Sequence, residues 1–318
     1  GLNWWRRRYE AHKYIKFFTK IKKIKYKPNL DYLITRIVNF FLKNNMKIKI
    51  LLVGKNSFIA TSIYKILYNK SDITKLSFSS LKNKKKKYFI KFDFIINCAI
   101  NQNYIKNKYK NSNDIDLYLA NKIVSANCKY IFISTRKVYS PKYNIKETNK
   151  TKPIDQYGKN KLKTENNLYK ILTDKLLVVR ASNIIGLKMM NKRKAHTTFL
   201  DYFCKNIFQN KIIDHKNVYK DFLSINQFVK ILFLLMKKNV SGVINVSLGK
   251  KVYLKDITKW LNYYNVKNYE YINNYKGMNF DSFTLNNSKL KKIIKNKILI
   301  SDLKEHCLSI SKKIFLKK

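Results

Sequence analysis

A tyrosine and a lysine four residues apart, Tyr157 and Lys161 in the stretch QYGKNK, form a pair that could transfer a proton. A tyrosine is a poor base at neutral pH because its free pKa is about 10. A neighbouring ammonium stabilises the phenolate and lowers that pKa, and residues four apart share one face of a helix. The pair is therefore a candidate for general acid–base catalysis.

The spacing alone does not single out this pair. The pattern Y-x-x-x-K also starts at Tyr9, Tyr104, Tyr118 and Tyr263. In a chain with 23 Tyr and a large excess of Lys, chance produces about four such matches. The surroundings of Tyr157 must distinguish it from the other four tyrosines.

Alternating strand and helix patterns surround Tyr157 and begin directly after Met46. Short apolar runs typical of buried parallel strands alternate with helical periodicity, which predicts an α/β fold. The expected architecture is a Rossmann-type doubly wound parallel sheet with a smaller C-terminal substrate lobe. The expected strands are residues 47–53, 73–78, 92–99, 129–135, 175–180 and 242–246, and the expected helices are 57–68, 114–126, 155–172, 198–208, 225–236 and one from about 254.

Three segments divide the chain. Residues 1–45 are basic and aromatic and form an N-terminal extension that is either foreign to the domain or a basic amphipathic segment. Residues 46–182 carry the strand and helix alternation and form the expected Rossmann-type domain. Residues 183–318 form mainly the expected substrate-binding lobe, with late elements that return to the sheet.

Four motifs follow one another at the ends of expected strands. The first strand runs into GKNSFIA (54–60), where a glycine turn opens a helix and can face a pyrophosphate. The next three are FDFIINCAI (92–100), FISTRKVYS (132–140) and VVRASNIIG (178–186). In this order, around Tyr157, they resemble the extended short-chain dehydrogenase/reductases of the NAD-dependent epimerase/dehydratase family, which act on nucleotide sugars.

This resemblance assigns roles to individual residues. It implies a catalytic triad of Thr135, Tyr157 and Lys161, in which Thr135 hydrogen-bonds the reacting oxygen. Lys161 would also hold the nicotinamide ribose. The implied cofactor-binding residues are Gly54, Ser57, Phe58, Ile59, Ser79, Cys98, Ala99, Ile100, Tyr157 and Lys161. The implied substrate-binding residues are Lys137, Asn183 and His196, and no metal ligand is expected.

The departures from the family pattern bear on the reaction. Family dehydratases carry an Asp-Glu pair after the Thr, and Arg136 and Lys137 occupy those places here, so dehydration is disfavoured. Reduction of a 4-keto sugar and 4-epimerisation both remain open, and the region around Tyr157 is similar to dTDP-4-dehydrorhamnose reductases. His196 follows Asn183 at a spacing close to that of an acid/base histidine in GDP-fucose synthases. The expected function is an NAD(P)-dependent reductase or epimerase in surface-polysaccharide precursor synthesis.

Two features concern the cofactor. The glycine pattern G-x-x-G-x-x-G keeps only Gly54, with Ser57 and Ala60 in the other places, which predicts a cost in cofactor affinity. The region after the second strand, SFSSLKNKKKK (77–87), lacks the acidic residue that an NAD site uses. Its serines and lysines suit a 2′-phosphate, which favours NADP over NAD, although a solvated lysine-rich loop explains them equally well. The crossover that contains this region is shorter than in the family.

The composition excludes several other classes of protein. A hydrophobic content of 45% argues against disorder. The net charge of +50 is spread along the chain as Lys rather than Arg, so we expect no specific nucleic-acid partner. Scattered cysteines and short apolar runs indicate a reduced cytoplasmic setting with no transmembrane segment. A homodimer is compatible with the family, and a non-catalytic Rossmann-fold regulatory or nucleotide-binding protein is the alternative function.

Overall fold

The computed structural model describes residues 47–187, 199–209, 211–214, 218–267, 270–273 and 282–316. The N-terminal segment 1–45 and His196 therefore lie outside the described residues. The chain from Ile48 onward forms one compact unit.

A six-stranded parallel sheet forms the centre of this unit. The strand order is β10-β5-β4-β3-β1-β2, and every neighbouring pair runs parallel. The chain winds outward from β1 in both directions, which confirms the predicted Rossmann-type doubly wound fold. The strands are β1 (Ile48–Val53), β2 (Ser71–Leu76), β3 (Phe94–Asn97), β4 (Lys129–Thr135), β5 (Leu176–Ala181) and β10 (Gly242–Val246).

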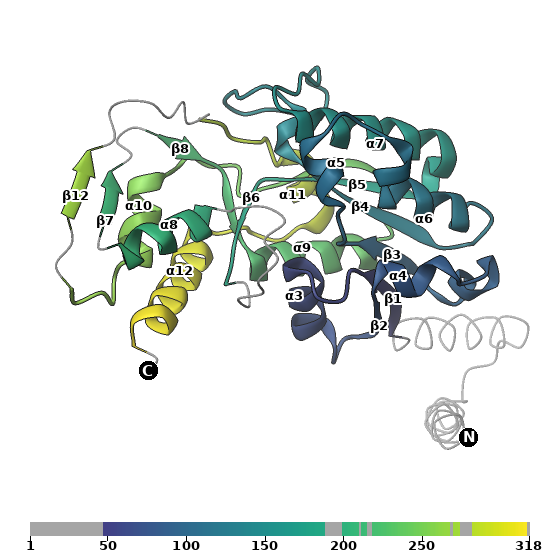
Figure 1. Cartoon of the computed structure of the whole chain (residues 1–318), viewed down its shortest axis with the longest axis horizontal. Coiled ribbons are helices and arrows are strands. Elements are labelled where there is room, and N and C mark those ends of the chain that lie inside the picture. Colours follow the sequence, from purple (N-terminus) through teal and green to yellow (C-terminus); the bar gives the residue numbers. More distant parts are fainter. Residues whose placement is uncertain are drawn as a thin grey trace, which may run out of the picture. The chain divides into compact units, whose positions relative to one another are not determined.

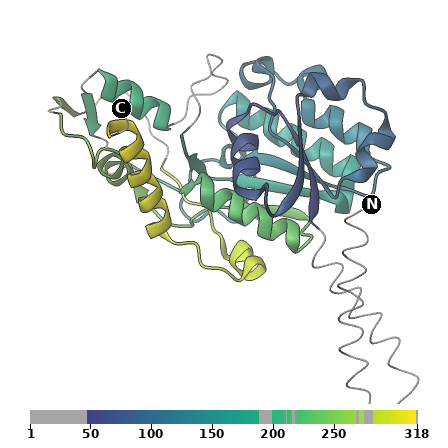
Figure 2. The ribbon, with the colours of Figure 1, turned by 90° about the horizontal axis from the view of Figure 1, so that it is seen from below.

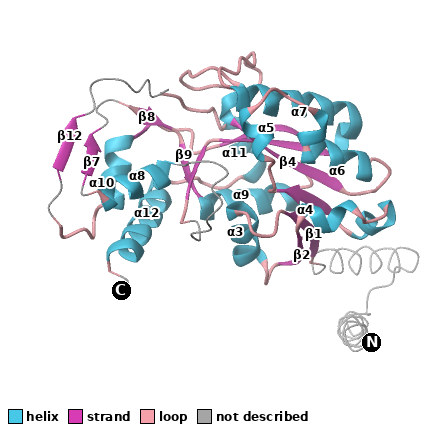
Figure 3. Cartoon of the chain, in the orientation of Figure 1, coloured by secondary structure: helices cyan, strands magenta, loops and turns pink. Residues whose placement is uncertain are grey.

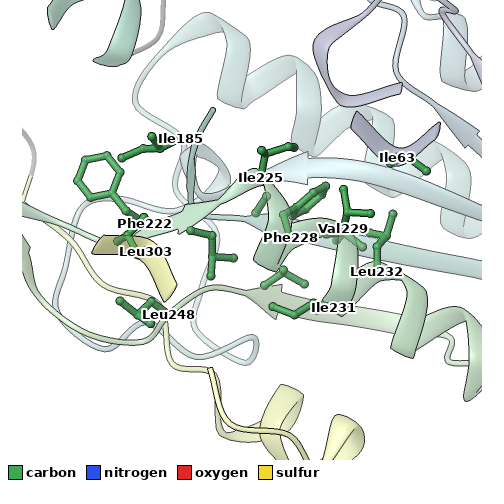
Figure 4. Packing of buried hydrophobic residues seen from close by; sticks show 14 of the residues in the cluster. Ile63, Ile185, Phe222, Ile225, Phe228, Val229, Ile231, Leu232, Leu248 and Leu303 are labelled. Carbon is green, nitrogen blue, oxygen red and sulfur yellow. The ribbon is translucent and has the colours of Figure 1, made fainter. Parts of the chain in front are cut away.

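Helices cover both faces of the sheet. On one face, α3 (Phe58–Leu67) and α9 (Ile225–Lys237) pack against the strands, and the cluster includes Ile63, Phe228 and Leu232 (Figure 4). On the other face, α6 (Ile115–Ile123) and α7 (Gln156–Leu172) pack against the same strands. They contact the strand side chains that point away from α3 and α9, because successive residues of a strand face opposite sides of the sheet. In Figure 1, α7 lies above the strands and α9 below them. Because both faces are covered, the strands need continuous apolar runs, as the sequence shows.

The crossover from β2 to β3 contains no further strand. It holds only α4 (Phe78–Lys82) and the 3₁₀-helix η1 (Lys86–Lys91), in agreement with the expected short crossover. As a result β2 is an edge strand, and the first five strands have the order 2-1-3-4-5 rather than 3-2-1-4-5. The switch point of the sheet, where a ligand is expected, lies between β1 and β3.

The C-terminal elements gather beyond the end of the sheet, at the left in Figures 1 and 2. They contain three short strand pairs (Figure 3), β6 with β9, β8 with β11, and β7 with β12. Their bounds are β6 (Asn183–Ile185), β9 (Phe222–Ser224), β8 (Tyr219–Lys220), β11 (Val252–Tyr253), β7 (Lys211–Asp214), β12 (Glu270–Asn273), α8 (Phe199–Phe208), α10 (Leu254–Leu261) and α12 (Ile300–Phe315).

Three elements after β6 return to the main sheet. Strand β10 pairs with β5, and α9 and α11 (Ser288–Ile294) pack beside it. The predicted division at residue 183 falls between β5 and β6, and a substrate-binding role for the later residues stays a prediction. Within the residues that the structure describes, no helix combines the length and the apolar character needed to cross a membrane.

Candidate active site

The N-terminus of α7 is fixed against the turn that follows β4. Asp155 caps the helix by accepting a hydrogen bond of 2.7 Å from the Gly158 amide. The same carboxylate forms an ion pair of 2.5 Å with Lys137, which lies in the 3₁₀-turn η3 (Arg136–Val138). A Cβ atom at position 158 would lie 2.3 Å from the Lys137 carbonyl oxygen, so this close approach requires glycine. Helix α7 therefore begins in direct contact with the end of β4.

Two ammonium groups flank the Tyr157 ring. The Nζ atom of Lys161 lies 5.9 Å from the ring centroid and that of Lys137 lies 6.0 Å from it. Lys161 is only 7% exposed, and its Nζ donates a 2.9 Å hydrogen bond to the Ile133 carbonyl oxygen in β4. Both ammonium groups therefore lie within about 6 Å of the Tyr157 ring.

Thr135 is the last residue of β4 and is partly exposed. Its Oγ1 accepts a 3.3 Å hydrogen bond from the Lys137 amide, which leaves the hydroxyl proton for another acceptor. The structure thus brings the predicted triad, Thr135, Tyr157 and Lys161, to the contact between the end of β4 and the start of α7. We call these three residues and Lys137 the catalytic wall, after the role that the sequence predicts for the triad.

A buried polar network lies behind the catalytic wall. Arg180 of β5 forms an ion pair of 2.6 Å with Glu165 of α7, and Ser134 donates a hydrogen bond to the same carboxylate. The network continues from Arg180 to the Tyr139 hydroxyl at 2.6 Å, and from that hydroxyl to Asn245 of β10 at 3.1 Å. Burial by itself would lower the pKa of Arg180, but the hydrogen bonds and charge of Glu165 raise it above its ordinary value. The sequence alone gives no sign that these two residues pair.

A clamp of side-chain hydrogen bonds from Asn160 holds the loop after β3 against α7. Asn160, which is fully buried, donates to the carbonyl oxygens of Tyr104 at 2.7 Å and Asn107 at 2.8 Å. Gln156 donates to the Asn160 side chain at 2.7 Å and fixes its orientation. The sequence does not predict the roles of these residues, because buried amide side chains give no periodic signal. The clamp places α5 (Gln102–Lys106) beside the first two turns of α7.

A second part of the site lies at the carboxyl ends of β1 and β3. Gly54 directly follows β1 with a φ of 88°, and a Cβ atom there would lie 2.7 Å from the Ala99 amide nitrogen. Ser57 caps α3 by accepting a 3.1 Å hydrogen bond from the Ala60 amide. Helix geometry leaves the Phe58 and Ile59 amides without intrahelical acceptors, so they can donate to an anion.

The segment after β3 completes this part of the site. The Asn97 side chain accepts from the Ala99 amide at 2.9 Å and donates to the Ala99 carbonyl oxygen at 3.1 Å, which holds the chain close to Gly54. We call Gly54, Ser57, Phe58, Ile59 and Ala99 the cofactor cradle. Free amides at a helix N-terminus beside a glycine turn fit the diphosphate of a dinucleotide.

Two further predicted cofactor residues flank the cofactor cradle. Cys98 is hydrogen-bonded to Ser57, and burial raises the pKa of its thiol to about 12. Ile100 follows Ala99 and is partly exposed. The structure therefore brings these predicted residues together with the cradle at the switch point of the sheet.

Ser79 lies apart from these residues, in α4 after the edge strand β2. It is exposed, and its hydroxyl lies 2.9 Å from that of Ser77. Of the lysines nearby, Lys75 lies 4.1 Å above the Tyr64 ring and Lys82 lies 5.5 Å above the Phe78 ring. Residues 75–87, all of which the structure describes, therefore offer hydroxyl groups and ammonium groups and no carboxylate at the end of β2.

Asn183 lies on β6, directly after β5, and is partly exposed. Its amide donates a 3.2 Å hydrogen bond to the Asp221 carbonyl oxygen. At the end of the same segment Gly186 packs against Phe58 of the cofactor cradle. The strand that carries Asn183 thus runs toward the cradle.

The fold is of the Rossmann type, and its switch point presents backbone amides beside a glycine turn. The family of this protein follows from a match to the model of the NAD dependent epimerase/dehydratase family over residues 29–247. This match covers more than half of the chain, and the chain belongs to that family. A comparison with curated proteins gave no match.

Solved structures of nucleotide-sugar enzymes share the fold at low sequence identity. UDP-N-acetylglucosamine 4-epimerase from Methanobrevibacter ruminantium M1, in complex with UDP-N-acetylmuramic acid, has a TM-score of 0.71 and 17% identity over 86% of this chain and 100% of its own. UDP-glucuronic acid 4-epimerase from Bacillus cereus, in complex with NAD, has a TM-score of 0.64 and 16% identity over 84% and 100%. dTDP-glucose 4,6-dehydratase from Bacillus anthracis, in complex with NAD, has a TM-score of 0.64 and 16% identity over 84% and 97%.

Proposed function

We propose that the protein is an NAD(P)-dependent enzyme that reduces or epimerises a nucleotide sugar with the triad Thr135, Tyr157 and Lys161. The observation that carries this proposal is the Tyr157 ring, flanked by the ammonium groups of Lys161 and Lys137 at 5.9 and 6.0 Å. Membership of the family supports the cofactor class. The similar structures, named as enzymes of UDP- and dTDP-sugars, support the substrate class.

The residues of the catalytic wall divide the proton chemistry among them. Thr135 donates a hydrogen bond to the reacting sugar oxygen and orients it. Tyr157 takes a proton from that oxygen or returns one, and the two ammonium groups stabilise its phenolate form. The cofactor cradle would hold a dinucleotide by its diphosphate, and the nicotinamide of that cofactor would supply or accept the hydride. Proton transfer by a positioned side chain of this kind accelerates a reaction by about 10²–10⁴-fold.

Reduction and epimerisation fit the wall better than dehydration. Arg136 and Lys137 stand where dehydratases carry their acidic pair, and neither can remove a proton from carbon as a carboxylate does. The Arg136 guanidinium lies 4.1 Å from the Phe283 ring centroid, and Lys137 is paired with Asp155. Lys137, Asn183 and His196 are the proposed substrate contacts, with Asn183 near the substrate diphosphate.

The remaining proposals concern the cofactor and the setting. The end of β2 presents Ser79 and several lysines with no carboxylate, which supports NADP over NAD, although similar structures are named as NAD complexes. We also propose that the enzyme acts in surface-polysaccharide precursor synthesis, is located in the cytoplasm and forms a homodimer.

The experiment compares Tyr157→Phe with Tyr263→Phe, an exposed tyrosine that also begins a Y-x-x-x-K match. A panel of nucleotide sugars and their 4-keto forms is assayed, with oxidation of NADPH and NADH as one readout and interconversion of epimers as the other. Tyr157→Phe should bind cofactor and lose turnover by about 10²–10⁴-fold. Tyr263→Phe should match the unmodified protein. Unimpaired turnover in Tyr157→Phe would refute the triad.

A non-catalytic Rossmann protein is the second candidate, and the serine at position 57 of the glycine turn favours it. This serine uses the Ala60 amide for its own cap and removes one donor from a bound diphosphate. Calorimetric titration with NADPH and with NAD separates the candidates. Binding of neither cofactor favours the regulatory protein, whereas binding without turnover of any sugar favours a nucleotide-binding one.

A further inference from the structure

The Lys161 ammonium is almost fully buried and lies among aromatic rings. The residue is 7% exposed, and its Nζ donates a 2.9 Å hydrogen bond to the Ile133 carbonyl oxygen. This bond uses one of the three N–H groups of the ammonium. The same Nζ lies over three rings, at 4.4 Å from the centroid of Phe132, 5.8 Å from that of Tyr104 and 5.9 Å from that of Tyr157. We call these three rings the aromatic box.

The rings of the aromatic box offset part of the cost of burying this charge. An ammonium loses its hydration when it is buried, and that loss is unfavourable without a partner. The face of an aromatic ring attracts a cation within about 6 Å, and more strongly where water is excluded. Phe132 is fully buried and Tyr104 almost fully, so both rings act on Lys161 where little water is present. The box therefore helps to keep the ammonium in place beside Tyr157.

Tyr104 joins the box from a separate element, α5, and its hydroxyl group holds its ring there. The hydroxyl oxygen lies 2.7 Å from Oγ1 of Thr164 in α7, and Thr164 donates a 2.6 Å hydrogen bond to the Asp114 carboxylate. Because Thr164 gives its proton to Asp114, the Tyr104 hydroxyl donates to Thr164. Burial raises the pKa of Tyr104 well above its ordinary value, so this hydroxyl stays neutral. Tyr104 therefore offers Lys161 a ring face and no negative charge.

We propose that Tyr104 is a positioning residue, whose ring closes the aromatic box and holds the Lys161 ammonium beside Tyr157. The inference rests on the proposed function in one respect, because it takes Lys161 and Tyr157 as a catalytic pair. Tyr104 also begins a Y-x-x-x-K match and faces the same lysine as Tyr157, but its hydroxyl is bonded to Thr164. This second tyrosine supports the lysine and takes no proton from the substrate.

The test measures how fast acetic anhydride acetylates Lys161, with the exposed Lys163 of the same helix as the internal standard. Fragment-ion mass spectrometry locates the modified lysine, so this readout needs no substrate. In the unmodified protein Lys161 should react far more slowly than Lys163. Tyr104→Leu removes the ring, and the ratio of the Lys161 rate to the Lys163 rate should rise about two- to thirtyfold, the range that a cation–π contact covers. Turnover in the panel of nucleotide sugars should fall by a similar factor.

Two further variants separate the ring from the stability of the region. Tyr104→Phe keeps the ring and removes the hydrogen bond to Thr164, so it should keep the low rate ratio and recover most of the turnover, although its stability falls. The matched control is Tyr109→Leu. Tyr109 also donates to Asp114, at 2.6 Å, and its ring centroid lies 6.2 Å from that of Tyr104. This control removes a ring from the same cluster and leaves the aromatic box intact, so rate ratio and turnover should match those of the unmodified protein.

Tyr104→Met replaces Tyr104→Leu if the leucine variant does not fold, because a flexible methionine fills an irregular space without offering a ring. An unchanged rate ratio in a folded variant without the ring, or an equal rise in Tyr104→Phe, would overturn the inference and leave the proposed function standing. The expected rate ratios, without turnover of any sugar by the unmodified protein, would support the aromatic box and overturn the proposed function.

Discussion

The cofactor cradle and the catalytic wall lie at the same end of the parallel sheet, but they are built from different groups. The cradle offers mainly backbone amides, at the start of α3 and beside Ala99. The wall offers side chains, and a buried network from Ser134 to Asn245 fixes the elements that carry them. The cradle therefore tolerates a changed sequence as long as its backbone geometry holds, whereas each polar residue behind the wall has a specific partner.

This difference explains why the glycine pattern of the cradle can depart from that of the family, while the wall keeps its buried hydrogen bonds. Ser57 keeps the start of α3 by capping it, and the Phe58 and Ile59 amides stay available. Behind the wall, loss of one member leaves a buried polar group without its partner, which is costly. Substitutions in the two regions should therefore differ in size.

The largest effect is expected from Arg180→Met. This change leaves the Glu165 carboxylate buried without its ion pair, and should lower the free energy of unfolding by about 3–5 kcal/mol. Urea denaturation followed by circular dichroism measures the loss. The double variant Glu165→Leu with Arg180→Met removes both charges and should recover most of it. A loss below about 1 kcal/mol in the single variant would show that the network does not fix the wall.

Gly158→Ala should come next, with a loss of about 1–3 kcal/mol from overpacking. The added methyl group would meet the Lys137 carbonyl oxygen at 2.3 Å and push η3 away from α7. Because this displacement separates Thr135 from Tyr157, turnover should fall more than cofactor affinity does. Kinetics and cofactor titration on the same preparation measure the two effects. Equal losses in both would contradict the division between wall and cradle.

Gly54→Ala should show the reverse pattern. Alanine at a φ of 88° is strained by about 1–3 kcal/mol, and its Cβ would approach the Ala99 amide to 2.7 Å. Cofactor affinity should fall with stability. Gly242→Ala is the matched control, because Gly242 has a φ of 85° but its nearest neighbour to an added Cβ is 4.0 Å away. The control should lose stability alone, and a matching loss of affinity there would contradict a local role for Gly54.

The smallest effect is expected from Ser57→Gly. Glycine is nearly as good a helix cap as serine, so stability should change by only a few tenths of a kcal/mol. The variant restores the second glycine of the family pattern and frees the Ala60 amide, which should strengthen cofactor binding. Ser57→Ala, which removes the cap, should cost about 1 kcal/mol. Weaker cofactor binding in Ser57→Gly would mean that the serine hydroxyl itself contacts the cofactor.

The sheet could be predicted from the sequence, because a strand buried on both faces needs an uninterrupted apolar run. The run at 129–135 and the helix after Asp155 match β4 and α7 closely. The expected strand at 92–99 is shorter in the structure, where β3 ends at Asn97 so that its side chain can hold Ala99. The positions of Thr135, Tyr157 and Lys161 came from motif order, and the structure brings all three to one place.

The buried polar residues could not be predicted in the same way. Asp116 and Glu165 lie in helical patterns where an acidic residue ordinarily faces solvent. Their burial depends on Tyr130 and Arg180, which lie on strands, and no local spacing records a contact of that kind. Likewise β2 is an edge strand because the crossover at 77–93 contains no further strand. The shortness of this crossover in the sequence does not by itself predict the edge position.

The pairing of β10 with β5 has a consequence for how the chain reaches its fold. Gly242 pairs with Leu177, so one side of β5 has no strand neighbour until the chain has been made as far as Val246. Until then the strand that carries Arg180 is an exposed edge, open to pairing with other chains. The Asn245 partner of Tyr139 also arrives with β10. Synthesis of residues 46–182 alone therefore leaves an incomplete sheet, and the ribosome must deliver the later residues before the wall is fixed.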